Sequence, residues 1–208
     1  MGRDAAQVLL AVLRRHIADD RVLAAMAATP RHRFVPPELL DRAYENAPLP
    51  IGGGQTISQP LVVARMCQLL DVWPGDRVLD VGTGSGWHAA LLARLGGAVV
   101  SVERDAALSA AAARTLQSVG VEGVELRVGD GFDGLRERAP YDAINVAAAA
   151  PVRALEVLEL QLADGGRLVA PLADGDQRLV LTRRDGERLE RHALEPVRFV
   201  PLVPGVVR

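Results

Sequence analysis

The sequence contains no lysine, and all 24 of its basic residues are arginines, scattered among 26 acidic residues. The formal net charge of −2 provides no electrostatic argument for a nucleic-acid or membrane-surface partner. Cys67 is the single cysteine, which excludes an internal disulfide and indicates a reducing, cytoplasmic location. Because Cys67 lies in an apolar stretch, we expect a small buried side chain there and not a reactive thiol.

Long apolar runs are also missing. No run reaches the length that a membrane-spanning helix needs, and Met1-Gly2-Arg3-Asp4 lacks the basic and then apolar pattern of a secretion signal. These features argue against secretion and membrane insertion. A chain of 208 residues is long enough for one α/β domain and short for two. We therefore expect a single domain over residues 1–208, acting as a monomer.

Hydrophobic spacing divides the chain into three parts. In residues 1–60 we expect helical spacing over 5–28, a short helix near 38–44 and a long irregular loop over 46–60. Residues 61–175 alternate helices with strands, which predicts a mostly parallel central sheet with helices on both faces. The strands are expected at 77–81, 98–102, 124–128, 143–146 and 167–171, and the helices at 62–70, 87–95, 106–119 and 152–162. In residues 176–208, Asp185-Gly186 between two strand-like segments, 178–183 and 189–200, predicts an antiparallel hairpin at the sheet edge.

A glycine-rich segment, Val81-Gly82-Thr83-Gly84-Ser85-Gly86, separates the first of these strands from the next helix. Ligands of open parallel sheets bind beyond the carboxyl ends of the strands, and glycine allows a ligand to approach the backbone closely. A G-x-G-x-G pattern alone also occurs in ordinary turns. The assignment therefore depends on the residues around it.

Two acidic residues follow the next two predicted strands. Glu103 stands 21 positions after Gly82, where a carboxylate can accept hydrogen bonds from both ribose hydroxyls of an adenosine cofactor. Asp130, just before Gly131, is placed to meet the adenine amino group. The alternatives are an exposed ion pair between Glu103 and Arg104, and an ordinary turn residue for Asp130. We favour the cofactor role for both.

The glycine spacing distinguishes between adenosine cofactors. Nicotinamide dinucleotides favour G-x-G-x-x-G, with the pyrophosphate at the helix N-terminus. Here the third glycine comes one residue earlier, at Gly86, and Trp87 occupies the dinucleotide position. Asp80 adds a negative charge that suits the sulfonium or ammonium group of S-adenosylmethionine and repels a pyrophosphate. We therefore expect S-adenosylmethionine, with S-adenosylhomocysteine as product, and not a dehydrogenase cofactor.

A more distinctive motif, Gly-Gln-Thr-Ile-Ser-Gln-Pro, ends at Pro60. With this motif, the chain resembles the protein-L-isoaspartate O-methyltransferase family. The resemblance runs from about Arg31 to Val203 and also includes the glycine loop, Ser101-Val102-Glu103-Arg104, Gly129-Asp130-Gly131 and the tail 196–202. It implies a Rossmann-like class I methyltransferase fold. It also implies methylation of the free α-carboxylate of L-isoaspartyl residues in damaged proteins and peptides, which starts their repair through a succinimide.

The resemblance further implies roles for individual residues. Ser58 matches the family's active-site serine, while Thr56 and Ile57 match positions that line the substrate and cofactor. From the residues alone, Ser58 is equally well explained as the N-cap of the following helix. The implied cofactor-binding residues are Gln55, Asp80, Gly82, Thr83, Gly84, Ser85, Gly86, Glu103, Arg104, Asp130 and Gly131, and no metal is implied.

The chemistry of the implied reaction needs little from the enzyme in the way of proton transfer. A carboxylate is ionised at neutral pH, so its attack on a methyl group needs no general base. We therefore expect Ser58 to orient the carboxylate as a hydrogen-bond donor. The tail matches the family's substrate-closing strand, so backbone groups from Val200 to Val203 are expected to pair with an extended peptide. Arg198 either meets the substrate carboxylate or is a structural charge.

Three positions depart from the family pattern. Gly53 stands where histidine is usual, Ala147 where threonine is usual, and Trp87 where tyrosine or a smaller residue is usual. These are the positions at which turnover or substrate preference would differ from typical members. Two rival functions remain: an enzyme that methylates ordinary aspartate in a biosynthetic peptide precursor, and a non-catalytic protein that only binds the cofactor product.

Overall fold

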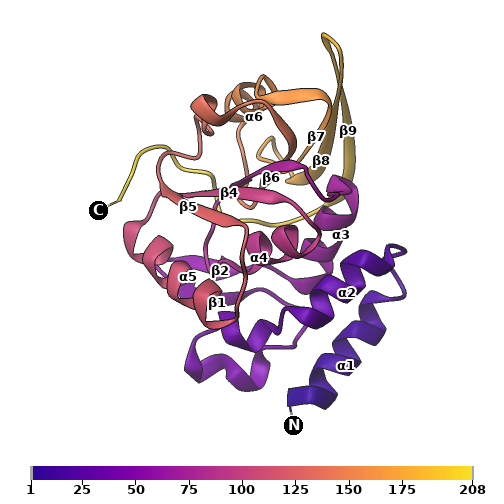
Figure 1. Ribbon diagram of the computed structural model, residues 1–208, viewed down its shortest axis with the longest axis vertical. Helices are drawn as coiled ribbons and strands as arrows, with labels where there is room; N and C mark the ends of the chain where they lie inside the picture. Colours follow the sequence, from indigo (N-terminus) through magenta and orange to yellow (C-terminus); the bar gives the residue numbers. More distant parts are fainter. Residues whose placement is uncertain (1, 208) are drawn as a thin grey trace.

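The computed structural model describes residues 2–207; Met1, which begins the N-terminal sequence considered above, and Arg208 lie outside the described residues. Within that range, a seven-stranded sheet has the order β5-β4-β3-β6-β7-β8-β9 (Figure 1). Its strands are β3 (Arg77–Val81), β4 (Ala98–Glu103), β5 (Val124–Val128), β6 (Tyr141–Val146), β7 (Leu162–Leu172), β8 (Arg178–Asp185) and β9 (Arg188–Pro196). The pairs from β5 to β7 are parallel, and β8 and β9 add antiparallel strands. This confirms the predicted sheet.

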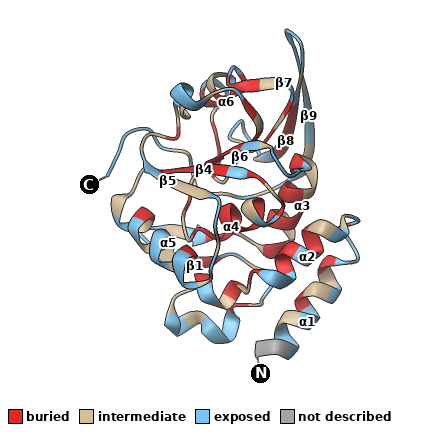
Figure 2. Cartoon of the chain, viewed as in Figure 1, coloured by how far each residue is buried: buried red, intermediate tan, exposed pale blue. Residues whose placement is uncertain are grey.

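Helices cover both faces of the sheet. The helices are α1 (Gly2–Leu13), α2 (Asp20–Ala28), α3 (Pro60–Leu70), α4 (Trp87–Arg94), α5 (Ala106–Ser118) and α6 (Val152–Glu159). Because strand side chains alternate between faces, Val78 joins a core with α3 and α4, whereas Leu79 joins a second core with α6. α1 and α2 form a further layer against α3, and Figure 2 shows the central strands buried between these layers.

The strand order places a ligand crevice at β3. After β3 the chain moves outward to β4 and β5, and then returns to β6 on the other side of β3. In open α/β sheets, ligands bind beyond the carboxyl ends of the strands where the order reverses in this way. The glycine loop leaves β3 at this point.

Residues 46–60 differ from the prediction of an irregular loop. They contain a small antiparallel sheet of β1 (Leu49–Gly52) and β2 (Gln55–Ile57), joined through Gly53 and Gly54 at φ of +59° and +72°. Strands of four and three residues are too short to give a hydrophobic period. The segment before them forms the 3₁₀ helices η1 (Arg31–Phe34) and η2 (Pro37–Arg42).

Some other predicted boundaries were wrong, and one short helix was missed. α6 ends at Glu159, because β7 begins at Leu162. β9 ends at Pro196, so residues 197–200 do not continue the hairpin. The short helix η3 (Arg136–Arg138) was not predicted. No helix among residues 2–207 is long and apolar enough to cross a membrane, and those residues contain no cluster of side chains suited to hold a metal ion.

Two glycines that follow helices offer a matched test of the fold. Gly96, after α4, has a φ of +110°, and a Cβ there would lie 2.8 Å from the Pro74 backbone. Gly120, after α5, has a φ of +61° and open space around it. We expect Gly96→Ala to reduce the free energy of unfolding by about 3 kcal/mol or more, because the new Cβ collides with Pro74 in addition to the backbone strain of a positive φ. Gly120→Ala should reduce it by about 1 kcal/mol, because it adds the backbone strain alone. Urea unfolding measures both, and equal losses would contradict the assignment.

Candidate active site

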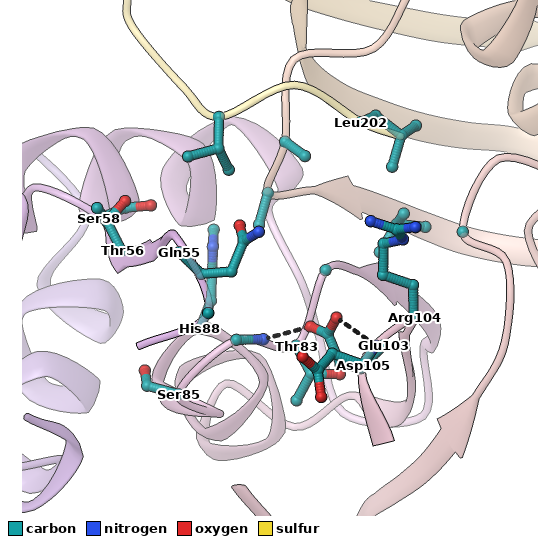
Figure 3. Close-up of a pocket in the computed structure, with 18 of the residues that line it drawn as sticks. Gln55, Thr56, Ser58, Thr83, Ser85, His88, Glu103, Arg104, Asp105 and Leu202 are labelled. Atoms are coloured by element: carbon teal, nitrogen blue, oxygen red, sulfur yellow. Dashed lines mark hydrogen bonds between the residues drawn. The ribbon is translucent and has the colours of Figure 1, made fainter. Parts of the chain in front are cut away.

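A cavity opens at the carboxyl ends of β3, β4 and β6 (Figure 3). Its lining combines the glycine loop after β3, Glu103 and Arg104 after β4, Ala147 after β6, and the β2 residues Gln55 to Ile57. Residues Val200 to Val203 of the C-terminal segment close it from above in Figure 3. The structure therefore brings together the glycine loop and the Gln55–Ser58 motif, which are far apart in the sequence.

The glycine loop adopts backbone conformations that other residues rarely reach. Gly82, Gly84 and Gly86 have φ of +91°, +51° and +84°. Gly82 and Gly84 line the cavity, whereas Gly86 is the N-cap of α4 and is buried against Ala112 and Leu116. The first two glycines thus form part of the cavity surface, and the third allows the helix to pack.

Glu103 is anchored beside the loop. Its carboxylate accepts hydrogen bonds from the Gly84 N–H at 2.9 Å and from the Asp105 N–H at 3.1 Å. Each carboxylate oxygen has a further lone pair that can accept a ribose hydroxyl. The alternative ion pair with Arg104 is not formed, since the Arg104 guanidinium donates to the backbone carbonyls of Gly205 and Pro204.

These contacts test which cofactor fits. In a dinucleotide site, the loop amides would receive a pyrophosphate, but here the Gly84 amide already binds a carboxylate. That carboxylate would repel a phosphate and accept ribose hydroxyls. Val102 and Leu202 add apolar walls for an adenine ring. The residues present fit an adenosine with a cationic centre, as in S-adenosylmethionine.

Asp80 lies behind the loop and does not line the cavity. It is fully buried, and its register partners on the neighbouring strands are Ser101 and Asn145. Ser101 donates to one Asp80 oxygen at 2.6 Å and Asn145 to the other at 2.7 Å. The Thr83 hydroxyl lies 2.6 Å from that of Ser101. Asp80 therefore acts on the cavity through its charge and through the side chains bonded to it.

Asp130 also binds within the protein. Its two carboxylate oxygens accept the N–H groups of Phe132 and Gly205, at 2.9 and 2.6 Å. The neighbouring Gly131 lines the cavity, and a Cβ there would lie 2.6 Å from Val81. Contact of Asp130 with the adenine amino group stays a prediction. Each Asp130 carboxylate oxygen has a further lone pair that could accept that amino group.

Ser58 does not cap a helix. Helix α3 begins at Pro60 with Gln59 as its N-cap, so the alternative role of Ser58 is not supported. Ser58 instead lines the cavity, together with Thr56. The Ser58 side chain is half-buried and is labelled in Figure 3 at one side of the cavity.

Arg31 holds the Ser58 segment, a role that sequence reasoning missed. This arginine is 1% exposed, and its guanidinium donates to the carbonyls of Ala43 at 2.7 Å, Ala47 at 2.9 Å and Ser58 at 3.2 Å. Burial lowers the pKa of Arg31 to about 10, which leaves it charged at neutral pH. No sequence signal marks these contacts, because every acceptor is a backbone carbonyl.

A second cavity adjoins the first. Arg198 lines it, with Phe199 and Val197 from the same segment. Four residues line both cavities: Thr56, Ser58, Ala147 and Val200. These four residues form the boundary between a cofactor-sized site and an open groove.

The C-terminal segment also binds backbone. The Ala149 carbonyl accepts a hydrogen bond from the Leu202 N–H, and the Ala149 N–H donates to the Val200 carbonyl, both at 2.8 Å. These groups of Val200 and Leu202 are therefore not free to pair with a peptide, contrary to the prediction. Alternation along an extended segment leaves Val203 facing the opposite edge, and Val203 lines the first cavity.

Two further lining residues had not been expected. Asp105 lines the cavity, although its carboxylate caps α5 through the N–H groups of Ala107 and Leu108. Its position before a helix had signalled only a cap. His88, in the first turn of α4, also lines the cavity. Of the three departures from the family pattern, Gly53 and Ala147 line it too, and Trp87 does so while its indole N–H donates to the Thr29 carbonyl at 3.1 Å.

Fold and cavity together define a class: S-adenosylmethionine-dependent methyltransferases with a Rossmann-like sheet. The family described as protein-L-isoaspartate (D-aspartate) O-methyltransferase matches residues 4–206. The chain belongs to this family, and it is therefore a carboxyl methyltransferase that uses S-adenosylmethionine.

Relatives and solved structures agree. A protein-L-isoaspartate O-methyltransferase from Methanoregula boonei is 51% identical over 195 residues, which cover 93% of this chain and 89% of the relative. One from Serratia proteamaculans is 49% identical over 200 residues, 96% of each chain. A solved protein-L-isoaspartate O-methyltransferase has a TM-score of 0.87 at 29% identity and covers 97% of this chain and 67% of its own. A Plasmodium falciparum structure in complex with S-adenosyl-L-homocysteine has a TM-score of 0.80 at 25% identity, covering 94% and 97%.

Burial of Asp80 predicts a pH-dependent loss of stability. Desolvation raises the Asp80 pKa to about 6, although hydrogen bonds from Ser101 and Asn145 favour the charged form. Because the folded pKa exceeds the unfolded value of 3.8, the stabilising contribution is complete below that value and is lost as pH rises through about 6. The loss above that range is on the order of 3 kcal/mol.

Asp80→Asn should remove this loss. We expect the variant to be more stable than the unmodified protein near about pH 8, with the difference shrinking toward about pH 4. Urea unfolding across this range measures the slope, and the exposed Asp174→Asn serves as the control that changes one carboxylate without burial. An Asp80→Asn variant that keeps the original slope would show that Asp80 does not titrate as described.

Proposed function

We propose that this chain transfers a methyl group to the free α-carboxylate of L-isoaspartyl residues, with the cofactor in the first cavity and the peptide in the second. The supporting observation is the shared boundary, where Thr56, Ser58, Ala147 and Val200 line both cavities. A carboxylate entering from the second cavity meets the first only there. Isoaspartyl methylation for protein repair is the activity of the family to which the chain belongs.

The cofactor side rests on the glycine loop and Glu103. The backbone of Gly82 and Gly84 lies against the ligand, and Glu103 accepts the ribose hydroxyls. The negative charge of buried Asp80 attracts a cationic ligand group, and burial leaves that charge weakly screened. Bound S-adenosylmethionine supplies an electrophilic methyl group on a sulfonium.

Ser58 orients the methyl acceptor. The substrate carboxylate is ionised at neutral pH and needs no base, so the useful contribution is a donor that holds it in line. The Ser58 hydroxyl lies at the boundary of both cavities, and the Arg31 guanidinium fixes its backbone. Ile57 and Val200, on either side, help to exclude water from the carboxylate.

Arg198 and Val203 complete the peptide site in this proposal. Arg198 is exposed and lines the second cavity, where a guanidinium attracts an anionic substrate. The Val203 backbone lines the first cavity, where it provides pairing groups for the part of an extended peptide that passes the boundary from the second cavity. The Arg198 role would favour carboxylate-bearing peptides over neutral ones, whereas backbone pairing at Val203 does not depend on peptide charge.

The rival functions have less support. The curated relatives reported above are named for isoaspartate methylation, which favours repair over modification of a biosynthetic precursor. An intact serine at the cavity boundary argues against a protein that only binds cofactor product. We also propose a cytoplasmic monomer, because Cys67 is buried as a free thiol and one chain provides both cavities.

Paired peptides test the substrate directly. Two peptides that differ only in having an L-isoaspartyl or an L-aspartyl linkage are offered with labelled S-adenosylmethionine. We expect base-labile methyl incorporation into the isoaspartyl peptide alone, because only that linkage leaves the α-carboxylate free, directly on Cα, whereas the aspartyl linkage leaves the β-carboxylate free beyond a CH₂ group. Equal labelling of both peptides would favour the aspartate-methylating alternative, and labelling of neither would exclude the proposal.

Ser58→Ala tests the orienting role. Loss of a donor to a charged acceptor should reduce kcat/KM for the isoaspartyl peptide by about 10- to 100-fold. Affinity for S-adenosylhomocysteine should stay within about twofold, since the glycine loop and Glu103 are unchanged. Ser118→Ala, at an exposed serine on α5, is the control. Full activity of Ser58→Ala would remove Ser58 from the mechanism.

A further inference from the structure

His88 is a buried histidine at the cavity that the mechanism above does not use. It is 7% exposed, it lines the first cavity, and Figure 3 shows its side chain among the lining residues. Its Nε2 atom has neither solvent contact nor a hydrogen-bond partner among the described residues. Buried polar groups are almost always paired, and an unpaired one at a ligand cavity therefore indicates a missing partner.

The neighbouring hydrogen bonds determine which nitrogen of His88 carries the hydrogen. Asp80 accepts on both oxygens, from Ser101 and from Asn145, so the amide nitrogen of Asn145 faces the carboxylate. That nitrogen also lies 3.2 Å from His88 Nδ1. An amide NH₂ can only donate, so its second hydrogen points to Nδ1, which must accept. The ring hydrogen is therefore on Nε2.

Burial also keeps the ring uncharged. Desolvation lowers the His88 pKa to about 3, which makes the imidazole neutral at physiological pH. The charged or titratable groups around it are Asp80, through Asn145, and Glu103 on the far side of the loop. His88 thus presents one fixed N–H donor and no positive charge. Its partner must be a hydrogen-bond acceptor.

The sheet order indicates which part of the cofactor reaches His88. Glu103 follows β4, on one side of β3, whereas Asn145, which binds His88, is on β6, on the other side. A cofactor with its ribose at Glu103 crosses the glycine loop and extends its methionyl arm toward β6. On that arm, the sulfonium and ammonium groups accept no hydrogen bond, so the carboxylate is the acceptor.

We propose that His88 is a cofactor-binding residue whose Nε2–H donates a hydrogen bond to the carboxylate of the methionyl arm. The proposal rests on the cofactor placement in the proposed function and deepens it. A substrate carboxylate has the same chemistry, but the second cavity, with Arg198, is not lined by His88. Because Nε2 has no solvent contact, the cofactor carboxylate reaches it by displacing part of the cavity wall.

Two ligands separate this contact from the rest of the site. S-adenosylhomocysteine has the amino-acid arm, whereas 5′-methylthioadenosine shares its adenosine and thioether and lacks the carboxylate. Calorimetry measures the affinity of both for the unmodified protein, His88→Ala and His88→Gln. We expect His88→Ala to weaken S-adenosylhomocysteine by about 10- to 100-fold and to leave 5′-methylthioadenosine within about twofold. His88→Gln, which keeps an N–H donor, should recover most of the affinity.

Each other outcome identifies a different error. Unchanged S-adenosylhomocysteine affinity in His88→Ala overturns the inference, and if KM for the isoaspartyl peptide rises instead, the acceptor is the substrate carboxylate. Equal weakening of both ligands also overturns it, since the carboxylate is then not involved. If the unmodified protein binds neither ligand, the cofactor placement in the proposed function fails, and not the role of His88 alone.

Discussion

The site depends on one carboxylate buried at the centre of the sheet. Asp80 lies on the middle strand at the point where strand order reverses, with Ser101 and Asn145 beside it in register. It orients both neighbours, because an ionised carboxylate only accepts hydrogen bonds. Through Ser101 it reaches Thr83 in the glycine loop, and through Asn145 it reaches His88. Two walls of the cavity are therefore set by one buried charge.

A buried negative charge destabilises the protein without ligand, and it can be stabilised by a bound cationic cofactor. Burial disfavours the ionised form of Asp80, and nearby Glu103 adds repulsion, since both raise the Asp80 pKa. A cationic ligand in the adjoining cavity relieves both effects, because opposite charges attract strongly where water is excluded. Strain of this kind is typical of functional sites, where stability is lower than the sequence would otherwise allow. Together with Glu103, which already binds the Gly84 amide, this charge would repel a pyrophosphate.

The sequence predicted the parts of this site that depend on local spacing. Glycines after an apolar strand indicated the loop, and the separation of Glu103 from Gly82 indicated a carboxylate beside it, where the structure has the Gly84 N–H bound to Glu103. The Asp80–Asn145–His88 contacts could not be predicted in this way, because they depend on strand register and on which residues of α4 face the sheet. Arg31 was missed for a related reason, since its acceptors are carbonyls up to Ser58 that only the folded chain brings together.

For Arg104 and Asp130, the sequence predicted a position near the cavity but not the contacts that the side chains make. Arg104 was expected at the cofactor and does line the cavity, but its guanidinium binds the C-terminal segment. Asp130 likewise accepts the Gly205 N–H. With Ala149 bound to Val200 and Leu202, the segment is attached on the β4 side, the β5 side and the β6 side of the cavity. The residues that follow these strands thus hold the C-terminal segment over the cavity as well as surround the cavity.

All three departures from the family pattern line the first cavity, and one of them lies where the two cavities meet. Ala147 lies on that boundary, where Thr56 and Ser58 provide two hydroxyls, and a threonine there would add a third. Gly53 has only Asp105 and Leu108 near its missing side chain, and its φ of +59° suits glycine better than a larger residue. The boundary therefore has two side-chain hydroxyls, those of Thr56 and Ser58, and the Ser58 carbonyl is bound by Arg31. In the proposed function, discrimination between carboxylates consequently depends on the positions of these two hydroxyls more than on a larger set of polar groups.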